Sequence, residues 1–350
     1  MRMKKPYPVS FHLKADDFIL ADPAEKQSLV IMRESVSFWQ DGARRLLRNK
    51  VAMVSAVVLL LIIILTFVIP VFYPYSYEQQ QKGAEYMPPF SYSQNEQNDI
   101  AAGGKVFPHI LGTDSLGRDY AVRVMVGGRI SLIVGIGAAI IIFFIGSIYG
   151  SVSAFLGGKV DIVMMRIVDI IYTIPDILII ILISFAINAP LKELAKNPSF
   201  AWLRVIGPNL ISIFIVFALL FWVGMARIIR SQILSLKESD FVMAARALGA
   251  SNGRIIRKHL LTNCMGTLIV TTTLQIPLSI FTESFLSFLG LGVAAPMPSL
   301  GSLASAAING LNTYPYLLMF PALLIALTIL SFNLFGDGLR DAFDPKLKQG

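Results

Sequence analysis

Six long apolar runs separated by polar segments dominate the pattern of this chain. A run of about 20 apolar residues is long enough to cross the hydrocarbon core of a bilayer as a helix. The pattern therefore predicts an all-α polytopic membrane protein with six transmembrane helices. The expected spans are Val51–Phe72, Ile130–Phe155, Val163–Ala186, Leu210–Ile229, Cys264–Leu289 and Tyr316–Phe335.

The connection over residues 239–263 is too long and too basic for a tight turn between the fourth and fifth spans. Its pattern predicts two short helices joined by a hinge. Residues suited to helix ends occur in order: Ser239 and Asp240 for the first start, Gly249 for a left-handed end, and Ser251 or Asn252 for the second cap. A compact folded loop of this kind is suited to contact with another protein.

Lysine and arginine predict the orientation of the chain, because cytoplasmic loops carry an excess of both. They cluster before the first span, in the fourth connection and in the C-terminal tail, so both termini are expected in the cytoplasm. The expected organisation is a cytoplasmic tail with an amphipathic surface helix (1–50), the first transmembrane helix (51–72), an extracytoplasmic insert (73–128), a five-helix core (129–338) that carries the 239–263 loop, and a cytoplasmic tail (339–350).

The insert contains a segment, residues 88–104, that is rich in Pro, Ser, Asn, Gln and Gly. That composition is typical of a loop. After it, Asp114 or Ser115 is expected to cap a helix that leads into the second span.

Several polar and small residues lie within or near the expected spans. Arg166 and Asp169 are three residues apart, so they are expected to pair on one helix face. Asp176 follows Pro175, which should kink the helix, and Glu283 lies within the fifth span. Asp176 and Glu283 either face a water-filled path or pair within the assembly and fix its packing. The GxxxG spacing of Gly146 and Gly150 predicts close helix packing.

Composition limits the function further. The 350-residue chain is 55% hydrophobic, and its formal net charge of +8 fits basic cytoplasmic loops, so it does not indicate nucleic acid binding. A single cysteine excludes an internal disulfide, and the three histidines (His12, His109 and His259) are too far apart to predict a metal site. The sequence has no GxxxxGK[ST] phosphate loop, HExxH or CxxC motif. A transport or scaffold component is expected rather than an enzyme.

The 239–263 loop resembles the EAA loop of permease subunits in binding-protein-dependent ABC importers. Ala244, Ala245, Gly249 and Leu261 match that pattern, whereas Met243, His259 and Thr262 depart from it. Segments 109–132, 283–301 and 332–348 resemble the C-type permease of the oligopeptide/dipeptide group, and the resemblance runs from about residue 33 to the end. Residues 78–105 are longer than the group suggests.

The resemblance implies a type I ABC importer permease fold in a bacterial cytoplasmic (inner) membrane. It implies a second permease subunit, two cytoplasmic ATPase subunits that bind ATP and Mg²⁺, and an extracytoplasmic peptide-binding protein; no cofactor is expected on this chain. The expected ATPase-coupling residues are Ala244, Ala245, Arg246, Gly249, Ala250, Ser251 and Arg254, and the expected path residues are Glu283 and Asp176. Alternatives are an importer for nickel or antimicrobial peptides, a stand-alone secondary carrier, or a membrane scaffold.

Overall fold

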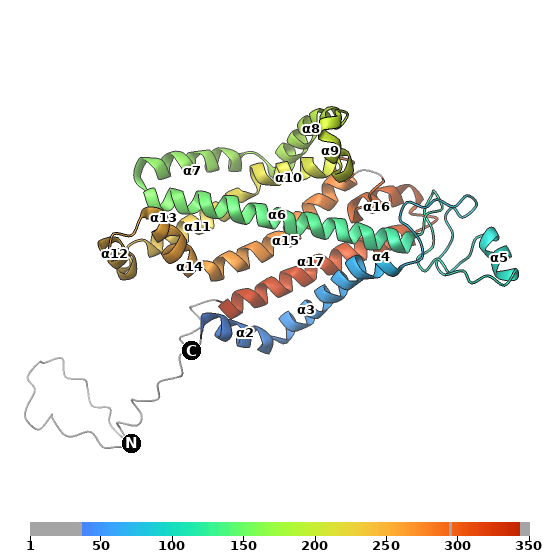
Figure 1. Cartoon of the computed structure of the whole chain (residues 1–350), viewed down its shortest axis with the longest axis horizontal. Helices are drawn as coiled ribbons and strands as arrows, with labels where there is room; N and C mark the ends of the chain where they lie inside the picture. The colour runs from blue at the N-terminus through green and yellow to red at the C-terminus, as the bar shows by residue number, and fades with distance from the viewer. Residues whose placement is uncertain (1–36, 294–295, 344–350) are drawn as a thin grey trace, which may run out of the picture. The chain divides into compact units, whose positions relative to one another are not determined.

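The computed structural model describes residues 37–293 and 296–343, and almost every element in these ranges is a helix (Figure 1). Within them, the isolated bridges Ser91–His109 and Thr113–Asp119 are the only β-type pairing. The chain divides into two units, Met1–Asp41 and Gly42–Gly350, and the packing below is that of the second unit.

Six helical segments of the described chain are long and apolar enough to cross a membrane, which confirms the predicted fold class. They are Lys50–Phe72 (α3, Lys50–Ile63; η2, Ile64–Val68; α4, Ile69–Phe72), α6 (Tyr120–Leu156), α8 (Asp176–Leu194), Pro208–Leu236 (α10, Pro208–Leu220; α11, Trp222–Leu236), α15 (Met265–Phe288) and α17 (Tyr316–Phe343). The other elements are α2 (Phe38–Arg48), α5 (Gln94–Ala101), α7 (Gly158–Thr173), η3 (Pro198–Phe200), α9 (Ala201–Ile206), α12 (Asp240–Ala247), α13 (Asn252–Arg254), η4 (Ile255–Leu260), α14 (Leu261–Asn263), α16 (Leu300–Ala307) and η5 (Ile308–Gly310).

Helix α2 covers the described part of the tail in which an amphipathic helix is expected; residues 1–36 lie outside the described residues. Leu47 is 65% exposed, as expected for an apolar residue on an amphipathic surface helix. Gly42 is buried against the ring of Phe343 in α17, where a larger side chain would clash. The second half of α2 therefore packs on the end of the last span.

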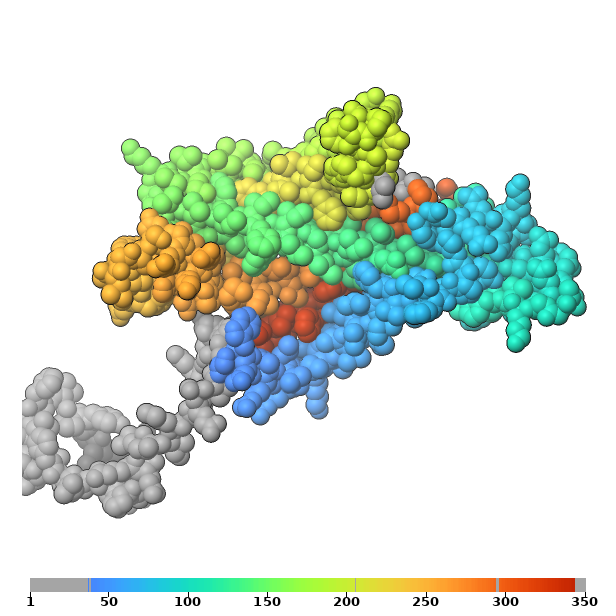
Figure 2. Space-filling view, in the orientation of Figure 1, coloured from blue at the N-terminus to red at the C-terminus, as the bar shows by residue number. Residues whose placement is uncertain are grey.

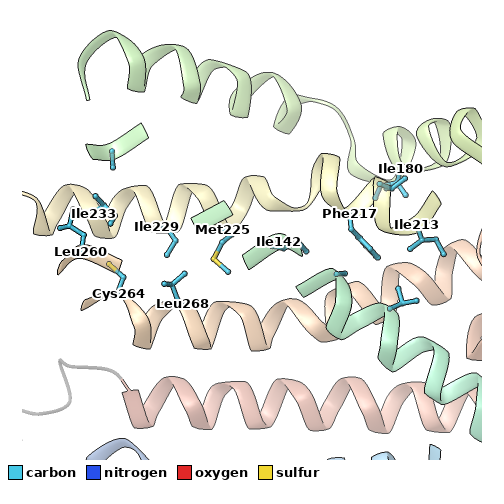
Figure 3. Packing of buried hydrophobic residues seen from close by; sticks show 14 of the residues in the cluster. Ile142, Ile180, Ile213, Phe217, Met225, Ile229, Ile233, Leu260, Cys264 and Leu268 are labelled. Atoms are coloured by element: carbon cyan, nitrogen blue, oxygen red, sulfur yellow. The ribbon is translucent and has the colours of Figure 1, made fainter. Parts of the chain in front are cut away.

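Helix α6 is the centre of the bundle and contacts α10, α11, α15, α16 and α17. Its buried Ile142 packs with Phe217, Met225, Ile229 and Leu268 from α10, α11 and α15 (Figure 3). The GxxxG prediction is confirmed at this contact, since a Cβ on Gly146 would lie 2.6 Å from the Cβ of Met225. The small residues let α6 and α11 approach closely along their lengths.

The third expected span is broken rather than kinked. Helix α7 ends at Thr173, Ile174 is extended (ψ 134°), and α8 begins at Asp176. Proline disfavours helical backbone in the residue before it, so Pro175 separates the helices. The expected pair of Arg166 with Asp169 is also wrong, because Asp169 Oδ1 accepts from Arg227 Nη2 of α11 at 2.8 Å. Helix α7 thus binds a neighbouring helix instead of pairing internally.

Side chains of α6 donate hydrogen bonds to two backbone carbonyl oxygens that lack their usual helical partner because a proline lies four residues later. Pro70 has no N–H for the oxygen of Thr66, and Arg129 Nε donates to that oxygen at 3.0 Å. Pro321 likewise leaves the oxygen of Leu317 free, and the hydroxyl of Tyr120 donates to it. A membrane interior offers no water for such groups, so these bonds fasten both η2 and α17 to α6.

The insert before α6 is folded more fully than its composition predicts. Ser93 and Glu96 form a capping box that starts α5 inside the segment expected to be loop. Asp119, rather than Asp114 or Ser115, caps α6 by accepting from the amide of Val122 at 3.0 Å. The carboxylate of Asp114 instead accepts from the amide of Leu116 and the side chain of Arg118.

Candidate functional site

The 239–263 loop forms a compact projection at one end of the helical bundle, opposite the end that carries α5 (Figures 1 and 2). Ser239 precedes α12, and Gly249 takes a left-handed conformation (φ +79°) that ends it. The amide of Ala250 donates to the oxygen of Ala245 and that of Gly249 to the oxygen of Arg246, both at 3.0 Å. These two bonds close the helix end in the way the glycine predicts.

One side of this loop is fixed to the bundle. Val242 of α12 and Ile255 and Leu260 of η4 have no exposed surface, and they join the same apolar cluster as Ile233 of α11. Burying each such side chain is worth about 1.5–3 kcal/mol. Ala245 belongs to this buried side, at 9% exposure. The loop is therefore a rigid extension of α11.

The other side of the loop is open. Of the residues expected to contact an ATPase, Ala244, Arg246, Gly249, Ser251 and Arg254 are exposed and Ala250 is partly exposed. Beside them lie the apolar side chains of Met243 and Leu248, which are 54% and 88% exposed. Within the described residues Arg254, Arg257 and Lys258 form no ion pair, so their charges face outward. The sequence pattern missed Leu248 as a surface residue, although its place before the glycine of an exposed turn is the available signal.

Two ion pairs join α11 to α7. Arg230 donates from Nε and Nη2 to the two carboxylate oxygens of Asp161 at 2.6 and 2.5 Å, and Ser153 of α6 donates to the same carboxylate at 2.5 Å. Arg227 pairs with Asp169 and lies over the ring of Tyr172, 4.2 Å from its centroid. Hydrogen bonds from Arg230, opposed by partial burial, hold the pKa of Asp161 below its usual range. The carboxylate is charged at neutral pH, so the ion pair holds α7 against α11.

A line of hollows follows one face of α15. The first, of about 280 Å³, is lined by Asp176, Phe281 and Thr282; the second, of about 180 Å³, by Asp176 and Gln275; the third, of about 550 Å³, by Gln275, Thr271, Thr267 and Arg340. Residues 267, 271, 275, 278 and 282 repeat every three or four positions, which places them on one helix face. We call the four polar residues of this face, Thr267, Thr271, Gln275 and Thr282, the polar face of α15.

The threonines on this face are mostly satisfied within the helix. The hydroxyl of Thr271 donates to the oxygen of Thr267 at 2.8 Å, and that of Thr282 to the oxygen of Leu278 at 2.9 Å. Threonine commonly makes such bonds to the preceding helical turn. Asp176, Gln275 and the hydroxyl of Tyr172 therefore hold the free side-chain hydrogen-bonding groups of the described residues along the two hollows that Asp176 lines.

Glu283 lies on the opposite, packed side of α15 and has no exposed surface. The hydroxyl of Ser131 in α6 donates to its Oε2 at 2.7 Å, and that of Ser287 to its Oε1 at 2.6 Å. Burial with hydrogen-bond partners on both oxygens is the arrangement a packing role requires. These contacts favour the packing alternative for Glu283, and its place on a path stays a prediction.

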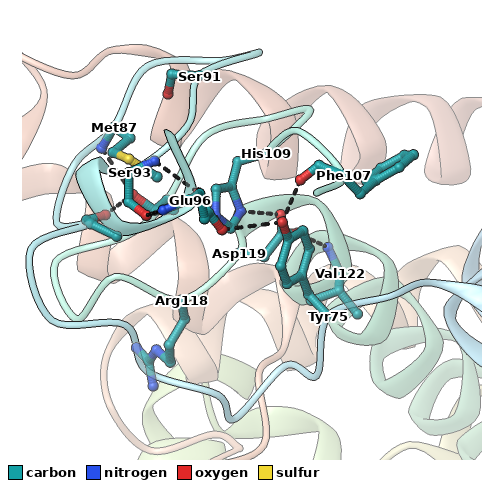
Figure 4. A network of polar contacts seen from close by, with 12 residues as sticks. Tyr75, Met87, Ser91, Ser93, Glu96, Phe107, His109, Arg118, Asp119 and Val122 are labelled. Carbon is teal, nitrogen blue, oxygen red and sulfur yellow. Dashed lines mark hydrogen bonds and ion pairs between the residues drawn. The ribbon is translucent and has the colours of Figure 1, made fainter. Parts of the chain in front are cut away.

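A polar cluster ties the insert to the start of α6 (Figure 4). His109 is 1% exposed, its Nδ1 lies 2.7 Å from Asp119, and its Nε2 lies 3.2 Å from Glu96. Tyr75 stacks on the imidazole and donates to Glu96 at 3.2 Å. Burial by itself raises the pKa of Glu96. The hydrogen bonds from Ser93 and the interaction with His109 lower the pKa by more than burial raises it, so the net pKa lies below its usual range. The described residues contain no group of three or more acidic, His or Cys side chains with metal-site geometry.

Known proteins resemble this chain over nearly its whole length. Residues 143–349 match the family described as "Binding-protein-dependent transport system inner membrane component", and residues 37–89 match the "N-terminal TM domain of oligopeptide transport permease C". The chain is 40% identical over 329 residues to the oligopeptide transport system permease protein OppC of Bacillus subtilis, covering 94% of this chain and 95% of that protein. It is 39% identical to the dipeptide transport system permease protein DppC of the same bacterium (95% and 93% covered) and 40% identical to OppC of Haemophilus influenzae (95% and 96% covered).

Proposed function

Since the chain belongs to the family of binding-protein-dependent transport system inner membrane components, it is a multi-pass membrane protein, and we propose that it is a permease subunit of an ATP-driven importer of oligopeptides or dipeptides. The observation that carries the proposal is the similarity to peptide permeases over 94% and 95% of the chain. It favours peptide cargo over nickel, and a permease subunit over a stand-alone carrier or a scaffold.

The importer needs further subunits. A second permease subunit would close the open side of the α15 hollows, and an extracytoplasmic binding protein would deliver peptide at the end that carries α5. Two ATPase subunits would bind ATP and Mg²⁺ at the opposite end, where Arg254, Arg257 and Lys258 lie. Basic residues at that end support a cytoplasmic position for the loop and both termini.

The 239–263 loop is the coupling element in this proposal. Met243 and Leu248 offer apolar surface for a groove on an ATPase subunit, and Arg246 and Arg254 offer charge at its rim. The departures from the EAA pattern fit this arrangement, because Met243 adds an exposed apolar contact where that pattern has a glutamate. Ala245 serves differently, as part of the buried attachment to the bundle.

The rigid attachment of the loop supplies a route for movement. Closure of the ATPase subunits would displace α12, the packed loop would carry α11 with it, and the ion pairs of Arg230 and Arg227 would carry α7. The break at Ile174 and Pro175 is the hinge at which α7 turns relative to α8. Rocking of rigid helices about such a hinge is a recognised way to alternate access across a membrane.

The polar face of α15 and Asp176 form this subunit's wall of the path. The mixture of apolar surface with few free polar groups suits cargo of variable sequence, because a strongly binding wall would slow release. Glu283 supports this wall from behind through its contacts with Ser131 and Ser287.

The proposal is tested by reconstituting the chain in lipid vesicles with its second permease, its ATPases and its binding protein. Uptake of a radiolabelled tripeptide should require ATP and all subunits. Uptake by this chain alone, driven by an ion gradient, would instead establish a secondary carrier. ATP-dependent uptake of nickel, without uptake of any peptide, would show that the transporter is a nickel importer.

A further inference from the structure

Asp176 occupies a special position in the wall formed by α8 and α15. It is exposed, it is the first residue of α8 after the break at Pro175, and it lines two adjoining hollows. Its neighbours there include Gln275, near the middle of α15, and Thr282, six residues before the end of α15.

Among the residues that the structure describes, Asp176 is the only charged one that lines these two hollows. The other lining residues of the first are apolar except for Thr282, and those of the second add Tyr172 and Gln275. An exposed carboxylate bordered mainly by apolar side chains attracts positively charged groups to the hollow. The site therefore favours a cation.

A cation beside this hollow, Arg227, is already engaged. Arg227 lies over the ring of Tyr172, which lines the same hollow as Asp176, but it donates to Asp169 at 2.8 Å. Within the described part of the chain, the carboxylate of Asp176 has no hydrogen-bond or ion-pair partner. No side chain in the described part of this subunit therefore neutralises the charge of Asp176.

We propose that Asp176 is the counter-charge for the positive groups of a peptide in transit, namely its terminal ammonium and any lysine side chain, with the amide of Gln275 beside it. This rests on the proposed peptide cargo. Every unblocked peptide carries the ammonium group, so one carboxylate serves cargo of any sequence while favouring basic peptides over acidic ones. An exposed ion pair is modest in strength, so the bound peptide is released readily.

The test uses the complete transporter in vesicles, with its binding protein saturated by Ala-Lys-Ala or Ala-Glu-Ala in separate assays. Asp176→Asn should lower the ratio of lysine-peptide to glutamate-peptide uptake by about two- to fivefold. Asp176→Glu should restore the ratio. Glu193→Gln is the matched control, because it removes the same charge from the far end of α8, where Glu193 is exposed and pairs with Lys196 of the next turn.

An equal fall in the uptake of both peptides, with an unchanged ratio, would overturn the assignment and leave a general structural role. So would loss of the second permease from the purified Asp176→Asn complex, since it would show that Asp176 pairs across the subunit interface. Absence of uptake of either peptide by the unaltered transporter would instead reject peptide cargo itself.

Discussion

Arg230 of α11 donates to both carboxylate oxygens of Asp161 in α7, with Nε–Oδ1 and Nη2–Oδ2 distances of 2.6 and 2.5 Å. The same carboxylate accepts from Ser153 of α6, so three helices meet at one side chain. Since α11 leads directly into the 239–263 loop and α7 leads to the hinge before Asp176, this ion pair links the helix beside the proposed ATPase contact to the helix beside the proposed path.

Asp161→Asn is expected to weaken that connection. The amide accepts on one oxygen only, so a charge-assisted bidentate contact is lost, at a cost of about 1.5–3 kcal/mol. We expect fewer peptides transported per ATP hydrolysed, with the ATPase activity largely kept. Asp169→Asn is the control, because its pair with Arg227 is more exposed and should matter less. Equal effects of both changes would argue against a specific role for Asp161.

Gly249→Val is expected to uncouple ATP hydrolysis from transport. The positive φ of Gly249 is unfavourable for a β-branched residue, so the end of α12 would shift although space for the side chain exists. Gly253→Val is the matched control in the same loop, since Gly253 also has open space but an ordinary φ. Peptide-stimulated ATP hydrolysis should fall in the first variant alone, with the complex still assembled. Normal uptake by Gly249→Val would count strongly against the coupling role.

Glu283→Ala is expected to reduce stability rather than to change selectivity. It leaves the hydroxyls of Ser131 and Ser287 without their acceptor in a buried site, at a cost of about 1–3 kcal/mol each. Glu283→Gln keeps one acceptor oxygen and should be milder. Thermal unfolding in detergent and membrane abundance measure the effect. If Glu283→Gln lost peptide uptake without losing stability, the packing role would be rejected and a role in the translocation path supported.

Tyr120→Phe is expected to destabilise the chain by about 1 kcal/mol or somewhat more, because it leaves the oxygen of Leu317 without a donor. Pro321→Ala restores a backbone N–H for that oxygen. The tyrosine change should therefore cost less in the Pro321→Ala background, and a double-mutant cycle of thermal unfolding measures the difference. Simple additivity would show that the hydroxyl does not serve the carbonyl freed by the proline.

The lowered pKa of Glu96 predicts that the folded protein loses stability in acid. Its pKa is lowered in the folded protein, so its contribution is complete above the pKa of the unfolded carboxyl, about 4.3, and disappears as the pH falls through the lower folded value. The melting temperature, measured from about pH 6 down to about pH 3, should therefore drop less steeply in Glu96→Gln than in the original chain. Parallel curves for the two proteins would remove Glu96 as the cause.

Much of the fold is readable from the sequence, because long apolar runs and helix-end residues act locally. The number of spans and the loop ends at Ser239 and Gly249 follow from such signals, whereas the third span begins at Asp176 instead of Val163. The partner of Asp169 does not, because Arg227 is 58 residues away and becomes its neighbour only when α7 packs on α11. The capping box of α5 was readable, but the Gln- and Asn-rich composition around it predicted a loop.

The candidate site is readable to a similar extent. The four-residue spacing of Thr267, Thr271 and Gln275 is visible in the sequence, yet only packing tells which face of α15 is open. For that reason Glu283 and Asp176 looked alike as charges in apolar surroundings. The fold separates them, since one has serine partners on both oxygens and the other has none in the described chain.

The hydrogen bonds from side chains of α6 to the carbonyl oxygens of Thr66 and Leu317 have a consequence for the order in which the bundle is completed. The first of these bonds joins segments 63 residues apart, whereas the second joins segments 197 residues apart. Both partners of the first bond are synthesised before the third span, whereas Leu317, the partner of Tyr120, is synthesised only with the last span. The bond between α6 and α17 therefore forms only after the last helix has been made.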